Sequence, residues 1–150
     1  MPRQDITPQY DDEIELQDAL MAFVRSFGLL ATHETPCGQP MPISQAHALT
    51  ELAQRSLTQL QLGEALGLRK STVSRLVDQL VDHRWAVRMS DANDARCSVV
   101  TLTASGRKRA KDISIARAQR FGELLNRIAP TDRTHVTTAI RLLAKAAHAN

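Results

Sequence analysis

Residues 57–83, LTQLQLGEALGLRKSTVSRLVDQLVDH, decide the fold of this chain. The stretch predicts a short helix that Gly67 ends, followed by a second helix that begins at about Arg69. The apolar or small side of the first helix comprises Leu57, Leu60 and residues 62–65. The apolar stripe of the second comprises Val73, Leu76, Val77 and Leu80, at spacings of three, one and three. Two such helices joined at a glycine are typical of a helix-turn-helix.

The other face of the second helix is polar and mostly basic at its start. Free N–H groups at a helix N-terminus attract phosphate, and hydroxyls or an arginine there can reach base edges in a major groove. We therefore expect DNA contacts from Arg69, Lys70, Ser71, Thr72, Ser74, Arg75 and Gln79. The alternative is the solvated face of an ordinary helix hairpin.

Length and composition set the class of protein. A chain of 150 residues with 43% hydrophobic and 23% charged residues suits one globular domain, with or without helical extensions. Aromatic residues make up only 3%, so aliphatic packing must dominate, which favours helices. We see no secretory signal, and no segment approaches the roughly 18 apolar residues of a membrane span. We expect a cytoplasmic protein with no membrane partner.

The charges are unevenly distributed along the chain. Residues 1–54 hold two cations and eight acidic residues, a net charge of −6. Residues 55–109 hold ten cations and five acidic residues, a net charge of +5, and residues 110–150 carry +4. The basic middle coincides with the predicted helix-turn-helix, which is the charge pattern expected of nucleic-acid binding.

A β-hairpin is predicted directly after the helix-turn-helix. Two short β-type runs, 85–89 and 98–102, flank the polar stretch 90–97, whose Asp, Asn and Ser residues suit a hairpin tip. A hairpin in this place makes a winged helix. Thr103 is expected to cap the helix that follows. The predicted fold class is mainly α with a small β-hairpin wing, flanked by N- and C-terminal dimerisation helices.

The flanking segments are predicted to be helical. We expect helices over 11–32, 43–55 and 104–128, and a last helix with Pro130 in its first turn, while residues 1–10 form a flexible arm. In helix 43–55, Ser44 is a candidate N-cap and the expected buried side is Ala46, Leu49, Leu52 and Ala53. The first helix carries the stripe Leu16, Leu20, Phe23, Phe27 and Leu30, and the last carries Val136, Ile140, Leu143 and Ala147. Such stripes are core, either within one chain or between two chains.

The sequence from about Ile43 to Arg107 resembles the MarR family of bacterial winged-helix transcription regulators. The stretches that carry the resemblance are Leu57-Thr58, Arg69 to Val77, Asp94-Ala95-Arg96, and Val100 to Arg107. Each is weak alone, but their order and spacing together are specific. The resemblance implies one domain over 1–150, with 11–42 and 104–150 as dimerisation helices and 43–103 as the DNA-binding region.

The resemblance also implies a function and partners. It implies a homodimeric, ligand-responsive repressor that binds a pseudo-palindromic operator on double-stranded DNA, with half-sites about 10 bp apart. It implies a small ligand, often aromatic and anionic, and a pocket near the N-terminal helix, the second helix and the start of the long helix. No cofactor is implied.

The wing tip adds candidate contacts. Arginine at a hairpin tip can enter a narrow minor groove, so Arg96 is expected to contact DNA. Asp94 is expected to hold Arg96 or Arg88 in one rotamer by a charge-assisted hydrogen bond, and the alternative is a surface ion pair of small energetic value. Arg88, Asp94 and Arg96 therefore join the predicted DNA-binding residues.

Arg84 departs from the family pattern, which usually has glycine just before the first wing strand. A glycine there fits a left-handed helix cap, and a non-glycine residue costs about 1 kcal/mol. Either the helix ends differently or the strain is tolerated.

Other chemistry has little support. Cys37 and Cys97 allow a redox-responsive regulator, and His33, Glu34, Cys37, His47 and Glu51 cluster near the first loop, as a metal-responsive regulator would require. Residues 104–128 contain no histidine to complete such a site, so no metal ligand is predicted. Catalytic motifs are absent, and we do not expect an enzyme. A winged helix used for protein–protein contact without DNA is the alternative from another class.

Overall fold

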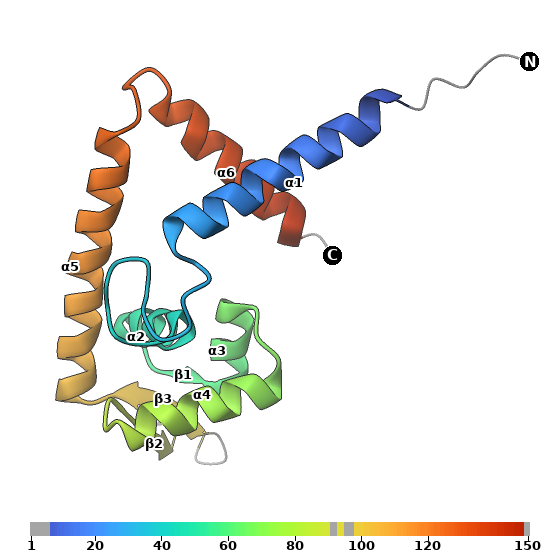
Figure 1. The fold of residues 1–150 in the computed structure, drawn as a ribbon. Helices are drawn as coiled ribbons and strands as arrows, with labels where there is room; N and C mark the ends of the chain where they lie inside the picture. The colour runs from blue at the N-terminus through green and yellow to red at the C-terminus, as the bar shows by residue number, and fades with distance from the viewer. Residues whose placement is uncertain (1–6, 91–92, 95–97, 149–150) are drawn as a thin grey trace, which may run out of the picture.

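A computed structural model describes residues 7–90, 93–94 and 98–148 of the chain (Figure 1). Its helices are α1 (Thr7–Phe27), α2 (Ile43–Gln54), α3 (Gln59–Leu66), α4 (Lys70–Asp82), α5 (Ala104–Asn126) and α6 (Arg133–His148). Its strands are β1 (Leu57–Thr58), β2 (Ala86–Ser90) and β3 (Ser98–Leu102). The predicted winged helix-turn-helix with flanking helices is confirmed.

The three strands form one antiparallel sheet in the order β1-β3-β2. β3 is central: Val100 pairs with Leu57 of β1 and with Arg88 of β2. The hairpin β2–β3 was predicted from two short β-type runs that flank a polar stretch. The two-residue β1 was not predicted, because so short a strand has no periodicity of its own. β1 ties the start of the helix-turn-helix to the wing.

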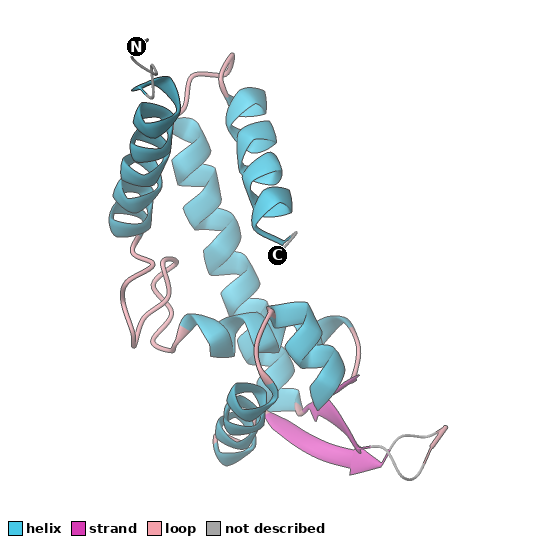
Figure 2. Ribbon diagram, turned by 90° about the vertical axis from the view of Figure 1, so that its right-hand side faces the viewer, coloured by secondary structure: helices cyan, strands magenta, loops and turns pink. Residues whose placement is uncertain are grey.

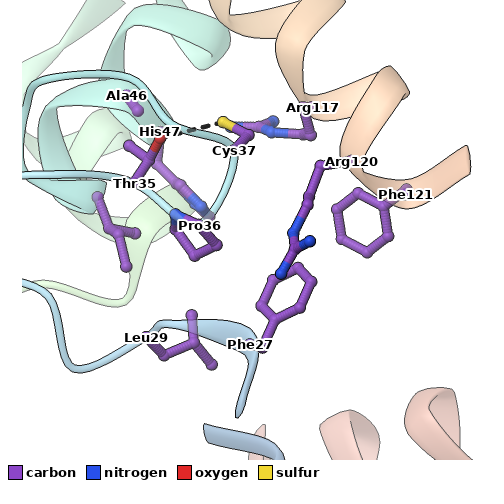
Figure 3. Close-up of a pocket in the computed structure, with 11 residues that line it drawn as sticks. Phe27, Leu29, Thr35, Pro36, Cys37, Ala46, His47, Arg117, Arg120 and Phe121 are labelled. Atoms are coloured by element: carbon purple, nitrogen blue, oxygen red, sulfur yellow. Dashed lines mark hydrogen bonds between the residues drawn. The ribbon is translucent and has the colours of Figure 1, made fainter. Parts of the chain in front are cut away.

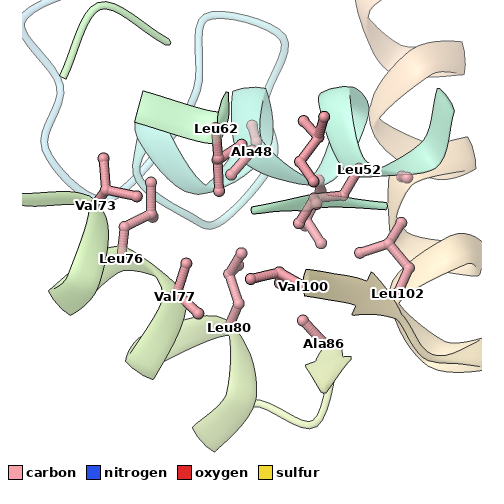
Figure 4. Packing of buried hydrophobic residues seen from close by; sticks show 14 of the residues in the cluster. Ala48, Leu52, Leu62, Val73, Leu76, Val77, Leu80, Ala86, Val100 and Leu102 are labelled. Carbon is pink, nitrogen blue, oxygen red and sulfur yellow. The ribbon is translucent and has the colours of Figure 1, made fainter. Parts of the chain in front are cut away.

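One aliphatic core lies where α2, α3, α4, α5 and the sheet meet (Figure 4). Its fully buried large side chains are Leu49, Leu57, Leu62, Val73, Val77, Leu80, Val100 and Ile113. The second helix of the helix-turn-helix is α4, which we call the recognition helix. Its predicted apolar stripe is confirmed, since Val73, Leu76, Val77 and Leu80 are all buried. The core therefore fixes the orientation of α4 and leaves its opposite face in solvent.

The terminal helices lie apart from this core. α5 extends from the wing past α2, and α1 and α6 lie on either side of its far half (Figure 2). α6 contains no buried residue, and none of the described side chains of α1 is buried. Their exposed large side chains include Leu16 at 55%, Phe23 at 39%, Ile140 at 50% and Leu142 at 64%.

Several helix boundaries differ from the prediction. α1 begins at Thr7 and ends at Phe27, because Gly28 has a φ of 87° and turns the chain out of the helix. Leu30 consequently lies outside the helix, 67% exposed. α5 ends at Asn126, and Pro130 lies in the turn before α6 rather than in its first turn.

Several side-chain assignments were also wrong. Pro42, not Ser44, is the N-cap of α2, and it makes no side-chain capping bond. Ala53 is exposed, whereas Gln45 and Ala48 are buried with the rest of that helix face. In the short helix α3, Leu60 is 72% exposed and Ala65 is also exposed. Because α3 spans only eight residues, its buried side is narrower than the sequence suggested.

Among the residues that the structure describes, no helix combines the length and apolar character that crossing a membrane requires.

Candidate nucleic-acid interface

Local sequence explains how the helix-turn-helix is held. Thr58 caps α3 through a reciprocal pair of bonds: its hydroxyl accepts from the Gln61 N–H at 3.2 Å, and its own N–H donates to Gln61 Oε1 at 3.0 Å. Gly67 ends α3 with a φ of 64°, a left-handed conformation that favours glycine. At Gly63, an added Cβ would lie 3.1 Å from Val73 Cγ2, so α3 and α4 approach closely there.

The polar face of α4 is exposed as predicted. Arg69, Lys70, Ser71, Thr72, Arg75 and Gln79 are exposed, and Ser74 is half-buried. Arg69 is the N-cap and makes no side-chain capping bond, and the first turn holds no acidic residue. The first N–H groups of α4 therefore have no carboxylate from that turn competing for them, which leaves the helix terminus suited to bind phosphate.

Arg88 of β2 pairs with Asp78 of α4. Of the two alternative partners predicted for Asp94, Arg88 is therefore engaged with Asp78, and the pairing with Arg96 stays a prediction. The reason for the Asp78 pairing is register: Arg88 lies opposite the buried Val100 in the sheet, and α4 packs against this part of β2. The pair joins the recognition helix to the wing. The side chains of Arg88 and Asp78 are 36% and 57% exposed, so the pair contributes at most about 1 kcal/mol to stability. Its role is to fix the position of the wing relative to α4.

Arg96, together with Asp91, Ala92, Ala95 and Cys97, lies outside the described residues, so its predicted minor-groove contact stays a prediction. Asp94 is described and exposed.

Gln45 is a site residue that was not predicted from the sequence. It lies on α2, is 5% exposed, and its Nε2 donates to Oε1 of Gln79 on the recognition helix at 3.2 Å. Beside this bond, a cleft of about 290 Å³ is lined by Ser44, Thr72, Arg75, Leu76 and Gln79. A polar residue at a buried helix position was the available signal, because such a residue requires a hydrogen-bond partner.

Arg84 keeps the left-handed conformation that the family pattern reserves for glycine. Its φ is 59°, the one positive φ outside glycine among the described residues. Its N–H donates to the Val81 carbonyl at 2.8 Å, and its carbonyl accepts from the Thr103 hydroxyl at 2.7 Å. The strain is therefore tolerated rather than avoided, because both backbone groups are bonded.

Trp85 lies next to Arg84, at the junction between α4 and β2. Its ring stacks on His83 with centroids 4.3 Å apart, and the Arg109 guanidinium of α5 lies 5.6 Å from the ring centroid. A Cβ added to Gly106 would lie only 1.9 Å from the carbonyl oxygen of Trp85. Trp85 is partly buried and packs against the core cluster.

A second site, a pocket of about 230 Å³, lies between the end of α1, the loop that follows, α2 and α5 (Figure 3). It is lined by Phe27, Leu29, Thr35, Pro36, Cys37, Ile43, Ala46, His47, Arg117, Arg120 and Phe121. The pocket was expected near the start of the long helix, but residues 117–121 belong to the second half of α5. The start of α5 is instead packed on the wing.

Two guanidinium groups make this pocket positive. Arg120 lies 5.5 Å from the Phe27 ring centroid, and its Nε is buried without a hydrogen-bond partner. Its Nη1 lies 3.9 Å from a carboxylate oxygen of Glu123. Desolvation by burial and the charge of Arg117 lower the pKa of His47, and Glu51 opposes the shift. His47 is therefore neutral at pH 7 and able to donate a hydrogen bond.

Cys37 lies in the same pocket, with Sγ 3.0 Å from the hydroxyl oxygen of the buried Thr35. Within the described ranges, His, Cys, Asp and Glu form no group of three able to hold a metal ion.

A helix-turn-helix with an exposed basic recognition helix, followed by a β-hairpin wing, defines a winged-helix DNA-binding protein. Residues 39–96 match the model of the MarR family. Over these residues the chain is similar to the MarR family of DNA-binding transcriptional regulators.

Solved structures share the fold. BpsR of Bordetella bronchiseptica, described for regulation of its DNA binding by 6-hydroxynicotinic acid, is 17% identical with a TM-score of 0.68, covering 96% of this chain and 98% of that one. PcaV of Streptomyces coelicolor, solved with its natural ligand, is 23% identical with a TM-score of 0.63, covering 98% and 99%. S. aureus MepR, solved with DNA, is 19% identical with a TM-score of 0.64, covering 95% and 99%.

Proposed function

We propose that this regulator is a homodimeric repressor that leaves its operator when a small aromatic anion binds the pocket between α1, α2 and α5. The observation that carries the proposal is the pocket itself, where two arginines accompany two aromatic rings with centroids 5.5 Å apart. The DNA-binding role is that of the family, and the ligand response, the dimer and the repression are the proposal.

The dimer is inferred from the terminal helices. A groove of about 600 Å³ between α1 and α6 is lined only by apolar side chains: Leu16, Ala19, Leu20, Phe23, Ala139, Ile140, Leu142, Leu143 and Ala146. An apolar surface of this kind is costly in water, and a second copy of the same helices covers it with matching chemistry. A two-fold dimer presents two recognition helices to one duplex and so suits a pseudo-palindromic site.

Base and phosphate contacts are assigned by position. The polar face of α4 supplies Arg69, Lys70, Ser71, Thr72, Ser74, Arg75 and Gln79. Arg96, which the sequence predicts at the hairpin tip, is assigned the minor-groove contact. Arg88 is assigned to holding the wing against α4, since Asp78 already neutralises it. This interface should weaken with salt, because each phosphate contact releases counterions.

The ligand class follows from the pocket chemistry. An aromatic ring can stack on Phe27 and Phe121, and a carboxylate can accept from Arg120, whose buried Nε has no other partner. BpsR responds to 6-hydroxynicotinic acid, an aromatic carboxylate, which supports this class for a chain of the same fold.

Release from DNA follows by population shift. Ile43, Ala46 and His47 of α2 line the pocket, and Gln45 of the same helix contacts α4. A ligand that binds more tightly when α2 is displaced favours a dimer whose recognition helices no longer match the half-sites.

The test is a displacement titration on the full chain. Protein bound to its own upstream DNA is titrated with 6-hydroxynicotinate, benzoate, cyclohexanecarboxylate and benzyl alcohol, and DNA release is followed by fluorescence anisotropy. We expect release by the two aromatic carboxylates and by neither of the others. Arg120→Gln should weaken that release about tenfold to a hundredfold, from the strength of a charged hydrogen bond, while the control Arg127→Gln leaves it unchanged. Release by all four compounds alike, or by none, contradicts the proposal.

A further inference from the structure

The buried amide of Gln45 stands at the point where α2 meets the recognition helix. It is 5% exposed, although glutamine is usually a surface residue. A buried amide without a partner is costly, and the partner here is Gln79 Oε1 at 3.2 Å. The bond joins residues 34 positions apart, so it depends on the packing of α2 against α4 rather than on local structure.

We propose that Gln45 is a positioning residue that determines which base Gln79 can read. This inference rests on the proposed placement of α4 in the major groove. Because Gln45 donates to Oε1 of Gln79, the acceptor end of the Gln79 amide is engaged inside the protein. The free end is Nε2, which only donates.

The consequence is a defined base preference. A free glutamine can bond adenine through both ends of its amide, accepting from N6 and donating to N7. A glutamine whose Oε1 is turned toward Gln45 presents its Nε2 donors to the groove. Such a side chain favours guanine, whose major-groove edge has two acceptors, O6 and N7, over adenine and thymine, which have one each, and it disfavours the N4 donor of cytosine.

The neighbourhood keeps Gln79 at the DNA-facing side. Thr72 and Arg75, two turns and one turn before it on α4, line the same cleft of about 290 Å³, and both are exposed. Arg75 and Gln79 are four residues apart on one helix, so they lie on one face and address neighbouring base pairs. The base next to the Arg75 contact is therefore the position whose identity Gln45 controls.

The experiment selects binding sites from a library of randomised duplexes, using the purified full chain. Wild-type protein should enrich a pseudo-palindrome with guanine favoured and cytosine disfavoured at one position in each half-site. Gln45→Met keeps the length of the side chain and removes the amide, so Gln79 is free to turn. The preference at that position should fall about fivefold or more, from the discrimination that one good base contact provides, while the other positions keep their preferences.

Gln79→Glu separates the two possible orientations of the amide. It keeps an acceptor for Gln45 and removes the donor that would face DNA. Guanine should then lose its advantage and cytosine should gain. If Gln79 instead reads bases through its oxygen, the Gln79→Glu variant would keep the wild-type preference, and the inference is wrong.

Two controls keep the outcomes distinct. Gln54→Met, which alters an exposed glutamine at the end of α2, should select the same site as wild type. A merely structural role for Gln45 would lower affinity for all sequences equally and leave the selected site unchanged, which overturns the inference. If wild-type protein itself enriches no site, it is the proposed operator binding that fails.

Discussion

The winged helix and the two terminal helices use their apolar residues in opposite ways. In the winged helix, Leu49, Leu62, Val77 and Leu80 have no exposed surface. In α6 no residue is buried, and Ile140 and Leu142 are at least half exposed. Both regions have helical apolar stripes, so the stripe alone does not tell which partner covers it. The winged helix is covered within one chain, and we infer that the terminal helices are covered between two.

The largest expected effect breaks the core of the winged helix. Leu80→Ala should lower the free energy of unfolding by about 2–5 kcal/mol, because it leaves a cavity among fully buried neighbours. Urea unfolding at fixed protein concentration measures it. Leu142→Ala is the matched control. At a protein concentration low enough for the chain to be monomeric, it should lower the free energy of unfolding much less. Equal losses would remove the distinction between the two regions.

The second prediction concerns the terminal helices. Ile140→Glu places a charge in the apolar groove between α1 and α6, and burying an unpaired carboxylate is costly, so the dimer should dissociate. Sedimentation velocity across micromolar concentrations measures the shift, while the circular dichroism of the helices stays in place. Arg141→Glu, at the neighbouring residue that does not line the groove, should remain dimeric. A monomeric wild type would contradict the inference that the terminal helices are covered between two chains.

A third prediction sharpens the role of the recognition helix. Arg75→Ala should weaken binding to the selected operator by about 1–3 kcal/mol and relax specificity at one base pair in each half-site. Fluorescence anisotropy on operator and scrambled duplexes gives both quantities. Dimerisation should not change. Unaltered operator affinity would show that this face of α4 does not enter the groove.

Arg84 offers a smaller effect at the junction of the recognition helix and the wing. Its φ of 59° suits glycine, so Arg84→Gly should stabilise the fold by about 1 kcal/mol or less. Thermal unfolding of the wild type and of Arg84→Gly measures the difference in stability. Arg84→Ala, which keeps the strain, serves as the control. If glycine and alanine behave alike, the backbone strain at this position has no energetic weight.

The smallest effect is a pH dependence from His47. Its pKa is lowered in the folded chain from the ordinary value of 6.5, chiefly by desolvation. As the pH falls through that value the unfolded chain takes up this proton first, so the fold loses stability. His47→Gln should remove that part of the loss between about pH 7 and 5. His135→Gln, on an exposed face of α6, is the control. A steeper loss in His47→Gln than in wild type would reverse the assigned sign.

The sequence predicted the elements whose patterns are strong. The stripe of α4, the Thr103 cap and strand 98–102 are as expected, since periodicity and capping chemistry are local signals. What the sequence missed is non-local. The Arg88–Asp78 pair, the burial of Gln45 and the short β1 depend on which segments pack together, and no local pattern contains that information. Gly28 was a local signal for the end of α1, but the apolar residues beyond it, such as Leu30, outweighed it in the prediction.

The most direct test of the regulator is a titration of the full chain against the DNA upstream of its own gene, beside a scrambled duplex of equal length, at two salt concentrations. The account predicts two chains per upstream duplex, binding that prefers the upstream DNA, and a loss of affinity with salt on both duplexes because phosphate contacts release counterions. Binding by single chains, or no binding to either duplex at low salt, would contradict a dimeric operator-binding regulator.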